Sequence, residues 1–539
     1  MPAAMSQQHT FQIQLEGLIT LLAQNLYADP DVFLREMLQN AHDSIQKRRA
    51  VKGKRRERDI PEPRIRVRVD RAARTIEIDD NGVGMLEKEL HDYLATSGRS
   101  GTRELREELA RGDRLQAVSL IGQFGIGLLS AFIVAARVDI DTLAVGGKPL
   151  RWSSAGDRHY EVGAGARAVV GSTVTLTLRD DHQRYLDLDR LRGIIRRYAD
   201  FLGVPVHLGD DPEPANAIHA PWHRQSWPSR EEQRKEYRQF WEGRFKEETS
   251  LDVFEVDEPF TYQVGDEART GRIHGILGIT DRHVPDVNTR GTVDLYIARM
   301  FICSGNREVL PGWARFIQGI VECDALTPNA ARDDVIRNAT LRAAQEVLGG
   351  RILRRFSELS PDRLQEILRW HAYHVLAMCV QDEHEGFFRA IADLVPLDSD
   401  LGPITIPAYL QHAPRRTDGV PQAFYIQEHG TATQFYMLCQ ARNLHVLNCS
   451  DPFAERFLQR YAETWPKKVH LTRLDLATAE TIFEPLSDNA ERRRFDALPA
   501  AYLQIFPDLS CIARVERFKP TEVPAPRARW GTSSCGSWR

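Results

Sequence analysis

The sequence predicts an α+β protein, and three kinds of observation support this fold class. Arg64–Asp70 and Thr173–Leu178 alternate between apolar and polar residues, as strands with one buried face do. Phe33–Ile45, an amphipathic stretch with helical spacing, precedes these strands. The composition is 42% hydrophobic and 27% charged, which is enough apolar material for real cores. A length of 539 residues predicts two to four domains.

The first part of the chain contains the clearest elements. Residues 11–49 predict two helices separated at Asp29–Pro30, and the charge run Lys47–Arg58 predicts a solvated loop. Arg64–Asp70 and Thr75–Ile78 predict a hairpin closed by residues 70–74. Together these elements predict an antiparallel-rich sheet with helices on one face over residues 1–212.

The later elements are separated by breaks rich in proline. Residues 209–221 are rich in proline and aspartate and predict a linker. Helical patterns follow at residues 222–246, 357–378 and 454–465, and a strand pattern covers residues 292–302. The expected division is an N-terminal domain (1–212), a linker (213–221), a middle domain of two subdomains (222–480) and a C-terminal piece (481–539).

Composition narrows the functional class. The formal net charge of −4 disfavours a dedicated nucleic-acid-binding protein. The seven cysteines include no CxxC pair, which favours reduced thiols over a zinc site or a disulfide framework. The first ten residues do not resemble a signal peptide, and no apolar run is long enough to cross a membrane. We therefore expect a cytoplasmic protein.

The first candidate site motif is Phe33–Ile45. Glu36, Asn40 and Asp43 fall on one face of a helix, with apolar residues around the rest of its circumference. This pattern fits a helix with a solvated polar side. It also fits a helix that lines a nucleotide pocket, where Glu36 acts as a general base and Asn40 offers an amide oxygen to Mg²⁺.

The second motif is Ile76–Met85, a strand that ends in Asp80 and a Gly-x-Gly turn. A carboxylate at Asp80 can accept a hydrogen bond from an exocyclic amine, and Gly82 and Gly84 let a flat ring approach the backbone closely. A plain surface turn explains the same letters, since Asp-Asn-Gly is a strong turn signal.

The third motif is Ile121–Ala135, in which three glycines precede an apolar stretch predicted to be helical. Free amides at a helix start bind phosphate, although no Gly-Lys-Ser/Thr follows. A glycine-kinked loop before a core helix is the alternative. Ala95–Thr102, rich in glycine and serine, predicts a mobile lid whose Arg99 reaches a phosphate or is solvated.

The three motifs, in this order, resemble the Bergerat ATP fold of gyrase, heat-shock chaperones, histidine kinases and MutL. Residues 9–45, TSGRSGT and IGQFGIGLLSAFIVA resemble the N-terminal segments of the heat shock protein 90 family, with which similarity extends to about residue 520. Residues 293–333 resemble that family's middle domain. The resemblance implies an N-terminal Bergerat sandwich, an α/β middle domain and a truncated α+β C-terminal piece.

The resemblance also implies roles for individual residues. Glu36 would polarise the attacking water, Asn40 would hold Mg²⁺, and Asp80 would bind the adenine amine. Arg332 would reach the γ-phosphate from the middle domain, a task that suits a guanidinium. The other residues implied to contact ATP are Asp43, Gly84, Met85, Arg99, Gly122, Gln123, Phe124, Gly125, Gly127, Leu128 and Thr173.

Four features depart from the family pattern. Tyr93, Leu128 and Ile336 stand where the family usually has an asparagine, an aromatic residue and a glutamine, and they bear on the hydrolysis rate more than on ATP binding. The family's dimerising helices do not follow residues 494–524. We therefore expect weak or no dimerisation, to be tested by light scattering at low micromolar concentration.

These inferences predict an ATP-dependent chaperone with ATP and Mg²⁺ as ligands and non-native proteins as clients. Two alternatives from other classes stay open. One is a nucleotide-binding holdase or adaptor with negligible hydrolysis. The other is a DNA-acting ATPase, which needs a basic surface and a transducer-domain lysine. A histidine kinase fits least, because no phospho-acceptor helix precedes the motifs.

Overall fold

The structure is a computed structural model of the whole chain. It divides into two compact units: Met1–Thr280 with Gly291–Arg351, and Asp281–Arg290 with Ile352–Arg539. We describe each unit separately. The residues that the structure describes are 29–52, 61–94, 127–157, 159–246, 249–282, 289–329, 333–427, 444–474, 483–486, 488–505 and 515–518.

A seven-stranded sheet organises the N-terminal part of the first unit. Its strand order is β5-β4-β3-β6-β2-β1-β7. Neighbouring strands are antiparallel except β1 and β7, which are parallel. The strands are β1 (Ile65–Asp70), β2 (Thr75–Asp80), β3 (Ala135–Leu143), β4 (Leu150–Ser154), β5 (Glu161–Ala164), β6 (Gly171–Leu178) and β7 (Val206–Leu208).

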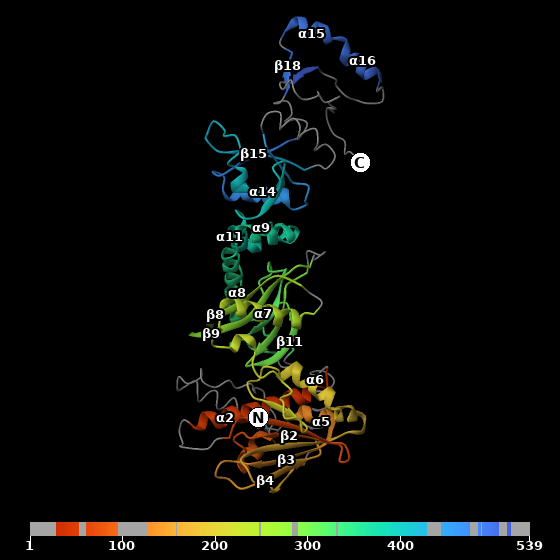
Figure 1. Cartoon of the computed structure of the whole chain (residues 1–539), viewed down its shortest axis with the longest axis vertical. Helices are drawn as coiled ribbons and strands as arrows, with labels where there is room; N and C mark the ends of the chain where they lie inside the picture. Colours follow the sequence, from red (N-terminus) through yellow and green to blue (C-terminus); the bar gives the residue numbers. More distant parts are fainter. Residues whose placement is uncertain are drawn as a thin grey trace, which may run out of the picture. The chain divides into compact units, whose positions relative to one another are not determined.

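Helices cover one face of this sheet (Figure 1). The long helix α2 (Val32–Lys52) packs on β2 and on α6 (Leu188–Ala199), and the short α5 (Ala131–Val134) packs on β3. Alternate side chains of β2, Ile76 and Ile78, are buried beneath these helices. The amphipathic pattern of residues 33–45 therefore forms a helix because its apolar side covers the sheet.

Two local expectations need correction. The charge run from Lys47 does not begin as a loop, because α2 continues through it to Lys52 and buries the Arg48 side chain. The apolar stretch after Gly127 does not form a long helix. It forms a 3-10 turn, η4 (Gly127–Ser130), then α5, and the chain is already a strand from Ala135. The residues from Ala135 onward are extended because they form β3, which pairs with β6.

Short helical segments complete this part of the unit. They are α3 (Glu87–Glu89), a π-helical turn η2 (Leu90–Leu94) and a 3-10 helix η5 (Asp180–Leu186). Tyr185 of η5 packs its ring edge-on against Phe33 at the start of α2, and its hydroxyl donates to Asp31 at 2.7 Å. This contact anchors the beginning of α2.

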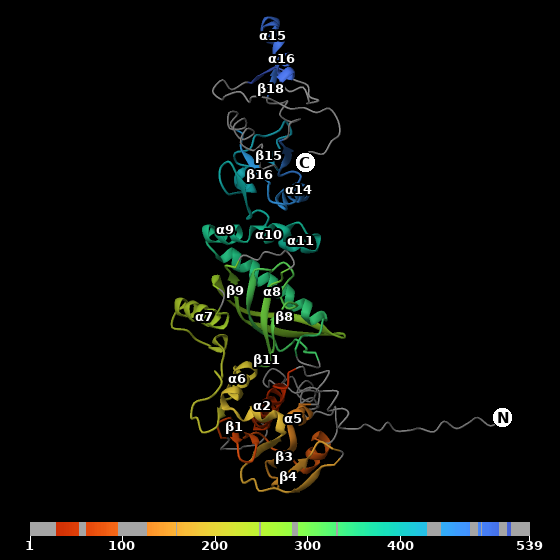
Figure 2. The ribbon, with the colours of Figure 1, turned by 90° about the vertical axis from the view of Figure 1, so that its right-hand side faces the viewer.

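A second sheet, with five strands, completes the first unit. Its order is β11-β10-β12-β9-β8. A 3-10 turn, η6 (Pro221–His223), and helix α7 (Arg230–Arg244) precede it, and helix α8 (Ala339–Glu358) follows (Figure 2). Trp241 of α7 is buried against β9, and its indole Nε1 donates to the carbonyl of Gln318 at 3.0 Å. The strands are β8 (Ser250–Val264), β9 (Glu267–Thr280), β10 (Thr292–Ile297), β11 (Met300–Asn306) and β12 (Ile317–Glu322).

The second unit also mixes helices and strands. A five-stranded sheet has the order β14-β13-β16-β15-β17, and a two-stranded sheet pairs β18 with β19. The strands are β13 (Pro396–Ser399), β14 (Ile404–Thr405), β15 (Gln422–Ile426), β16 (Val446–Asn448), β17 (His470–Arg473), β18 (Phe483–Pro485) and β19 (Glu516–Phe518). The helices are α9 (Pro361–Trp370), α10 (Ala372–Cys379), η7 (Asp382–His384), α11 (Glu385–Ile391), α12 (Ile406–Tyr409), α14 (Ala454–Thr464), α15 (Asn489–Phe495) and α16 (Ala497–Ile505).

These sheets and helices confirm the α+β fold class. Among the described helices, none is both long and apolar enough to cross a membrane. Four cysteines in the described ranges, Cys303, Cys323, Cys379 and Cys449, are free thiols. Burial raises the pKa of the Cys303 and Cys323 thiols to about 12, so these two groups are poor nucleophiles at neutral pH.

Candidate nucleotide site

The candidate site is built on α2, which contacts two of the three sequence motifs. Near the helix start, Glu36 lies against Gly127, since a Cβ added to Gly127 would come within 2.8 Å of Glu36 Oε2. Two turns later, Ser44 lies against Gly82, where an added Cβ would be 2.0 Å from Ser44 Oγ. Eight residues of α-helix span about 12 Å. The turn at Gly127 and the turn that follows Asp80 therefore contact the same stripe of α2, at Glu36 and Ser44 respectively.

The middle of that stripe faces solvent. Between Val32 and Arg48, Asn40 is the only exposed residue, whereas Glu36 and Asp43 are buried. A helix with its whole polar side in water, the simpler interpretation of the pattern, therefore does not describe Glu36 and Asp43. An exposed amide between two buried carboxyl groups is the arrangement expected where a helix borders an open site.

Glu36 is held by its neighbour Arg35. The Arg35 guanidinium donates from Nε and Nη2 to Glu36 Oε1 at 3.3 and 3.1 Å, and both side chains are buried. Glu36 Oε2 is the oxygen that lies toward Gly127. The Arg35 guanidinium therefore fixes the orientation of the Glu36 carboxyl group, with Oε2 on the side of Gly127.

Asp80 ends β2 in a buried position. Its Oδ1 accepts a hydrogen bond from the amide of Gly82 at 2.7 Å. Burial raises the pKa of Asp80 from 3.8 to about 7, although the Gly82 amide, the Arg167 charge and the Ser44 hydroxyl oppose this shift. A buried carboxyl with a strongly raised pKa is a common mark of a functional site.

The turn after Asp80 has no room for side chains. Gly84 has a φ of +68°, and a Cβ there would lie 2.1 Å from the carbonyl oxygen of Leu143. The amide of Met85 donates to the Thr142 hydroxyl at 2.9 Å, which ties the turn to β3. The two glycines are therefore needed for the turn to fit between α2 and β3.

Strand alternation decides which residues share the face of Asp80. Asp80 pairs with Ser172 across β2 and β6, and Ser172 pairs with Thr142 across β6 and β3. The hydroxyls of Ser172 and Thr142 lie 3.0 Å apart. Asp80, Ser172 and Thr142 therefore line the helix-covered face of the sheet.

Thr173 lies on the other face. Its hydroxyl donates to Asp79 Oδ1 at 2.9 Å and contacts Arg167. Ser172, and not Thr173, therefore lies on the face of Asp80, because successive side chains of a strand point to opposite faces. The residue of β6 that pairs with Asp80 shares its face of the sheet, and that residue is Ser172.

Sequence reasoning also missed two arginines that fix the acidic turn. Arg48 Nη1 donates to the carbonyl of Asn81 at 2.8 Å, and Arg167 Nη2 donates to the carbonyl of Asp80 at 2.8 Å. In the sequence, Arg48 belongs to a charge run typical of a solvated loop, and Arg167 lies in no motif. Ser44 was missed because it looks like an ordinary helix residue.

The remaining assignments divide into two groups. Met85 and Leu128 are half-buried, next to the turn and in η4 respectively. Six assigned residues lie outside the described part of the chain: Arg99, Gly122, Gln123, Phe124, Gly125 and Arg332. Their roles stay predictions.

Comparison with known proteins shows similarity over parts of the chain outside the candidate site. The Hsp90 protein family model matches residues 281–471. Over 517 residues the chain is 28% identical to the chaperone protein HtpG of Idiomarina loihiensis, covering 89% of this chain and 79% of that protein. It is 32% identical over 374 residues to the HtpG proteins of Paraburkholderia xenovorans and Burkholderia lata.

The last two alignments cover 65% of this chain, and the chain spans 57% of those two relatives. The family model covers the end of the first unit and much of the second, whereas the longest alignment takes in 89% of the chain. The chain is therefore similar to the Hsp90 family, and over most of its length it is similar to a bacterial HtpG chaperone.

Proposed function

We propose that this chain is an ATP-dependent chaperone that binds ATP with Mg²⁺ in the site along α2. The observation that carries the proposal is the stripe of α2 that meets the Gly127 turn at Glu36 and the Asp80 turn at Ser44. A stripe about 12 Å long suits a ligand with an amine at one end and phosphates at the other.

Each end of the stripe has chemistry that suits its part of ATP. At one end, Asp80, with Ser172 and Thr142 beside it, accepts a hydrogen bond from the adenine amine. At the other end, the start of η4 offers the phosphates backbone amides. The amide oxygen of the exposed Asn40 is a suitable ligand for Mg²⁺, which neutralises phosphate charge when bound.

Glu36 is the proposed general base. Its carboxylate accepts a proton from the attacking water, and the Arg35 ion pair orients it. Arg332 is proposed, from the family resemblance, to stabilise the charge that develops on the γ-phosphate. In this proposal the residues 1–212, 222–480 and 481–539 act as nucleotide, middle and C-terminal domains, respectively.

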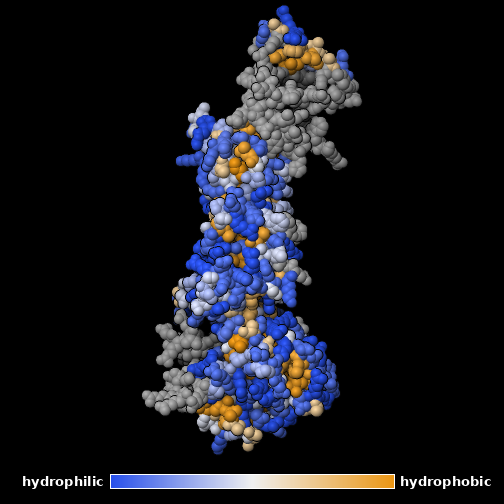
Figure 3. All heavy atoms as spheres, in the orientation of Figure 1, coloured by the Kyte–Doolittle hydropathy of each residue, from blue (hydrophilic) through white to orange (hydrophobic). Residues whose placement is uncertain are grey.

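Clients are proposed to bind apolar surface. The visible face of the molecule is mainly hydrophilic with separate apolar patches (Figure 3). In the second unit, Trp370, Tyr373 and Leu401 are large apolar side chains with at least a third of their surface exposed. Exposed apolar groups of this kind suit non-native chains, which present apolar segments of their own.

The proposal is tested by measuring ATP binding and turnover in matched variants. We expect Glu36→Ala to retain ATP affinity and to lose turnover by about 100-fold or more, since general-base catalysis contributes about that much. We expect Arg332→Ala to lower turnover, with Arg337→Ala, an exposed arginine paired with Glu308, as its control. Equal turnover in wild type and Glu36→Ala would favour a holdase or adaptor instead.

A further inference from the structure

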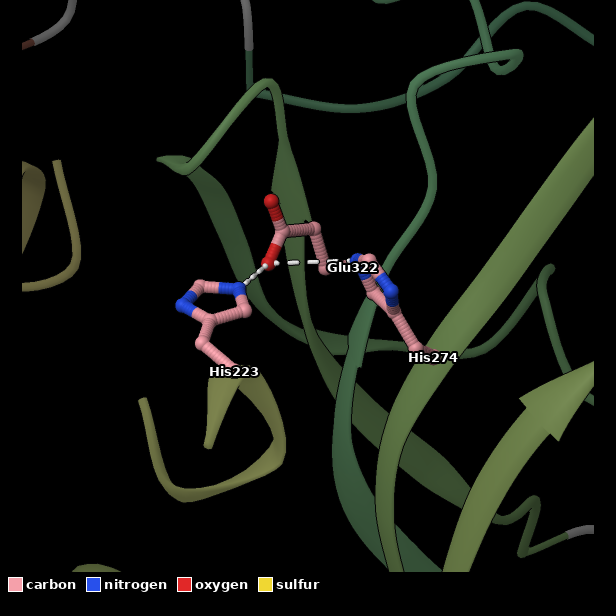
Figure 4. A group of neighbouring side chains, drawn as sticks. All are labelled: His223, His274 and Glu322. Atoms are coloured by element: carbon pink, nitrogen blue, oxygen red, sulfur yellow. Dashed lines mark hydrogen bonds and ion pairs between the residues drawn. The ribbon is translucent and has the colours of Figure 1, made fainter. Parts of the chain in front are cut away.

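A second cluster of titratable side chains lies away from the nucleotide site. His223 ends η6, His274 lies on β9, and Glu322 ends β12. Both histidine rings point toward one carboxylate oxygen of Glu322 (Figure 4). His223 Nε2 is 2.7 Å from Glu322 Oε2, and His274 Nε2 is 3.5 Å from the same atom. The indole Nε1 of Trp222 also donates to it, at 3.2 Å. Glu322 is only 3% exposed.

The hydrogen bonds fix the protonation of His223. The backbone amide of Ala220 donates to His223 Nδ1 at 3.2 Å, so this nitrogen carries no proton. The proton must then sit on Nε2, which donates to Glu322. His223 is therefore a neutral imidazole, a tautomer inferred from its partners. Trp222 is neutral as well, so neither group supplies a positive charge to balance the buried carboxylate.

His274 is the group that can supply that charge. Its side chain is 30% exposed, so water reaches it, and it pairs directly with Glu322. Burial by itself would lower the pKa of His274, but the hydrogen bond and charge of Glu322, with the charges of Asp324 and Asp257, raise it above the ordinary value. Burial would raise the pKa of Glu322, but its histidine partners hold it well below the usual range.

The other charged groups near His274 and Glu322 have hydrogen-bond partners of their own or lie farther from the pair. Asp257 on β8 is bound in a two-pronged contact by Arg272 of β9, with both N–O distances at 2.5 Å. Asp324 accepts a hydrogen bond from the amide of Ala298 at 2.7 Å. His219 faces His223 and Arg299, and burial and the charge of Arg299 lower the pKa of His219, so it stays neutral near pH 7.

The same three side chains would also be considered for a transition-metal site, but two features oppose this. A metal on His223 Nε2 needs the ring proton on Nδ1, where the amide of Ala220 already points its hydrogen. The Nε2–Oε2 distance of 2.7 Å is that of a hydrogen bond. Ligand atoms each about 2.0 Å from one zinc ion in tetrahedral geometry are farther apart than this.

We propose that His274 and Glu322 form a proton-dependent latch that holds Trp222 and His223, at the end of residues 213–223, on the five-stranded sheet. With His274 protonated, the buried carboxylate has a counter-charge and holds Trp222 and His223 in place. When His274 loses its proton, Glu322 keeps only neutral donors and the latch loosens, because a buried charge without a counter-charge is unfavourable.

The latch matters because of what it holds. Residues 213–223 connect β7 of the seven-stranded sheet with α7, which precedes the five-stranded sheet. Trp222 packs edge-on against Phe201, which follows α6, with ring centroids 5.6 Å apart. Phe201 in turn lies 5.2 Å from the ring of Tyr296 on β10. Loosening this segment would change the coupling between the two sheets of the unit.

The proposal goes beyond the ATP-dependent function and is tested without nucleotide. The readout is amide hydrogen exchange of a peptide covering residues 213–227 in the full chain, corrected for the intrinsic rate at each pH. The sign follows from the raised pKa of His274: the stabilisation is full below the ordinary value of about 6.5 and is lost as pH rises through the folded-state pKa. We expect protection to fall between pH 6 and pH 8.5, by about tenfold for each unit by which the pKa is raised.

Variants separate the latch from general effects of pH. His274→Gln keeps a neutral donor and removes the charge, so we expect its protection at pH 6 to equal that of wild type at pH 8.5 and to stay constant with pH. Glu322→Gln should abolish the pH dependence as well. If Glu322→Gln fails to fold, His274→Gln still decides. His470→Gln, at an exposed histidine on β17, should behave like wild type.

Three results would overturn the proposal. The first is protection of residues 213–227 that does not change with pH in wild type. The second is a pH-dependent loss of protection that persists in His274→Gln. The third is a cobalt absorption band at pH 8 that disappears in His223→Gln and His274→Gln, since that would make the cluster a metal site.

Discussion

The buried carboxyl of Asp80 lowers the stability of the folded chain at neutral pH. Its environment raises its pKa to about 7, because burial outweighs the Gly82 amide, Arg167 and Ser44. Between about pH 4 and pH 7 the folded chain retains a proton that the unfolded chain has lost. The free energy of unfolding therefore falls as pH rises through this window, by an amount of order 4 kcal/mol.

Replacing Asp80 with asparagine should raise stability and remove ATP binding. The asparagine side chain would keep an oxygen for the Gly82 amide but present an NH₂ group to the adenine amine. We expect D80N to be more stable than wild type by a few kcal/mol at pH 8 and nearly equal at pH 4. We expect at least a tenfold loss of ATP affinity, measured by calorimetry.

The matched control is Asp141→Asn, at a half-buried carboxyl opposite Thr173 on the other face of the sheet. D141N should retain ATP affinity. If both variants lose affinity equally, or D80N retains it, Asp80 does not contact the base.

At Gly84 the local geometry leaves no room for a side chain. We expect Gly84→Ala to lower the free energy of unfolding by at least about 1–3 kcal/mol, since φ is +68° and the added Cβ meets the Leu143 carbonyl at 2.1 Å. Gly193→Ala, in α6 with nothing within 4 Å of the added Cβ, should stabilise by about 0.5–1 kcal/mol. Urea unfolding of both variants checks the opposite signs.

At the scale of elements, α2 and β6 decide the site. Helix α2 brings Glu36, Asn40 and Ser44 into one stripe by its periodicity, and β6 separates Ser172 from Thr173 by its alternation. Neither element has an unusual sequence. The candidate site arises because α2 packs against β2 and β6, which are distant from each other in the chain.

The alternation in β6 gives a prediction. Ser172→Ala should weaken ATP binding, because it removes a hydroxyl from the face of Asp80 that bonds with Thr142. Thr173→Ala should change affinity less, because its hydroxyl contacts Asp79 and Arg167 on the opposite face. Titration calorimetry on both variants tests the register, and a larger loss for Thr173→Ala would contradict this assignment.

For the molecule as a whole, charge bears on the alternative functions. A net charge of −4 gives little long-range attraction for a polyanion. We therefore expect no retention of duplex DNA at physiological salt, measured by fluorescence anisotropy. Binding that weakens steeply with added salt would revive the DNA-acting ATPase.

Local patterns in the chain were sufficient to predict the fold class and to single out Glu36, Asn40 and Asp80 as candidate site residues. Alternation in residues 64–70 and 173–178 and the periodicity of residues 33–45 can be recognised without knowledge of their partners. Glu36 and Asp80 each had a plain explanation on its own, and they stood out because their motifs occur together in one order along the chain. The helical part of the charge run and the early end of the helix after Gly127 were not visible locally.

Long-range packing decides on which face of the sheet each side chain lies. It also gives several ordinary residues their contacts with the candidate site. Ser44, Arg48 and Ser172 gain their roles from contacts with segments far away in the sequence. The cluster of His223, His274 and Glu322 brings together residues up to 99 positions apart, and no spacing rule connects them. The physical reason is that burial and pairing are properties of the packed chain, whereas periodicity is a property of a short segment.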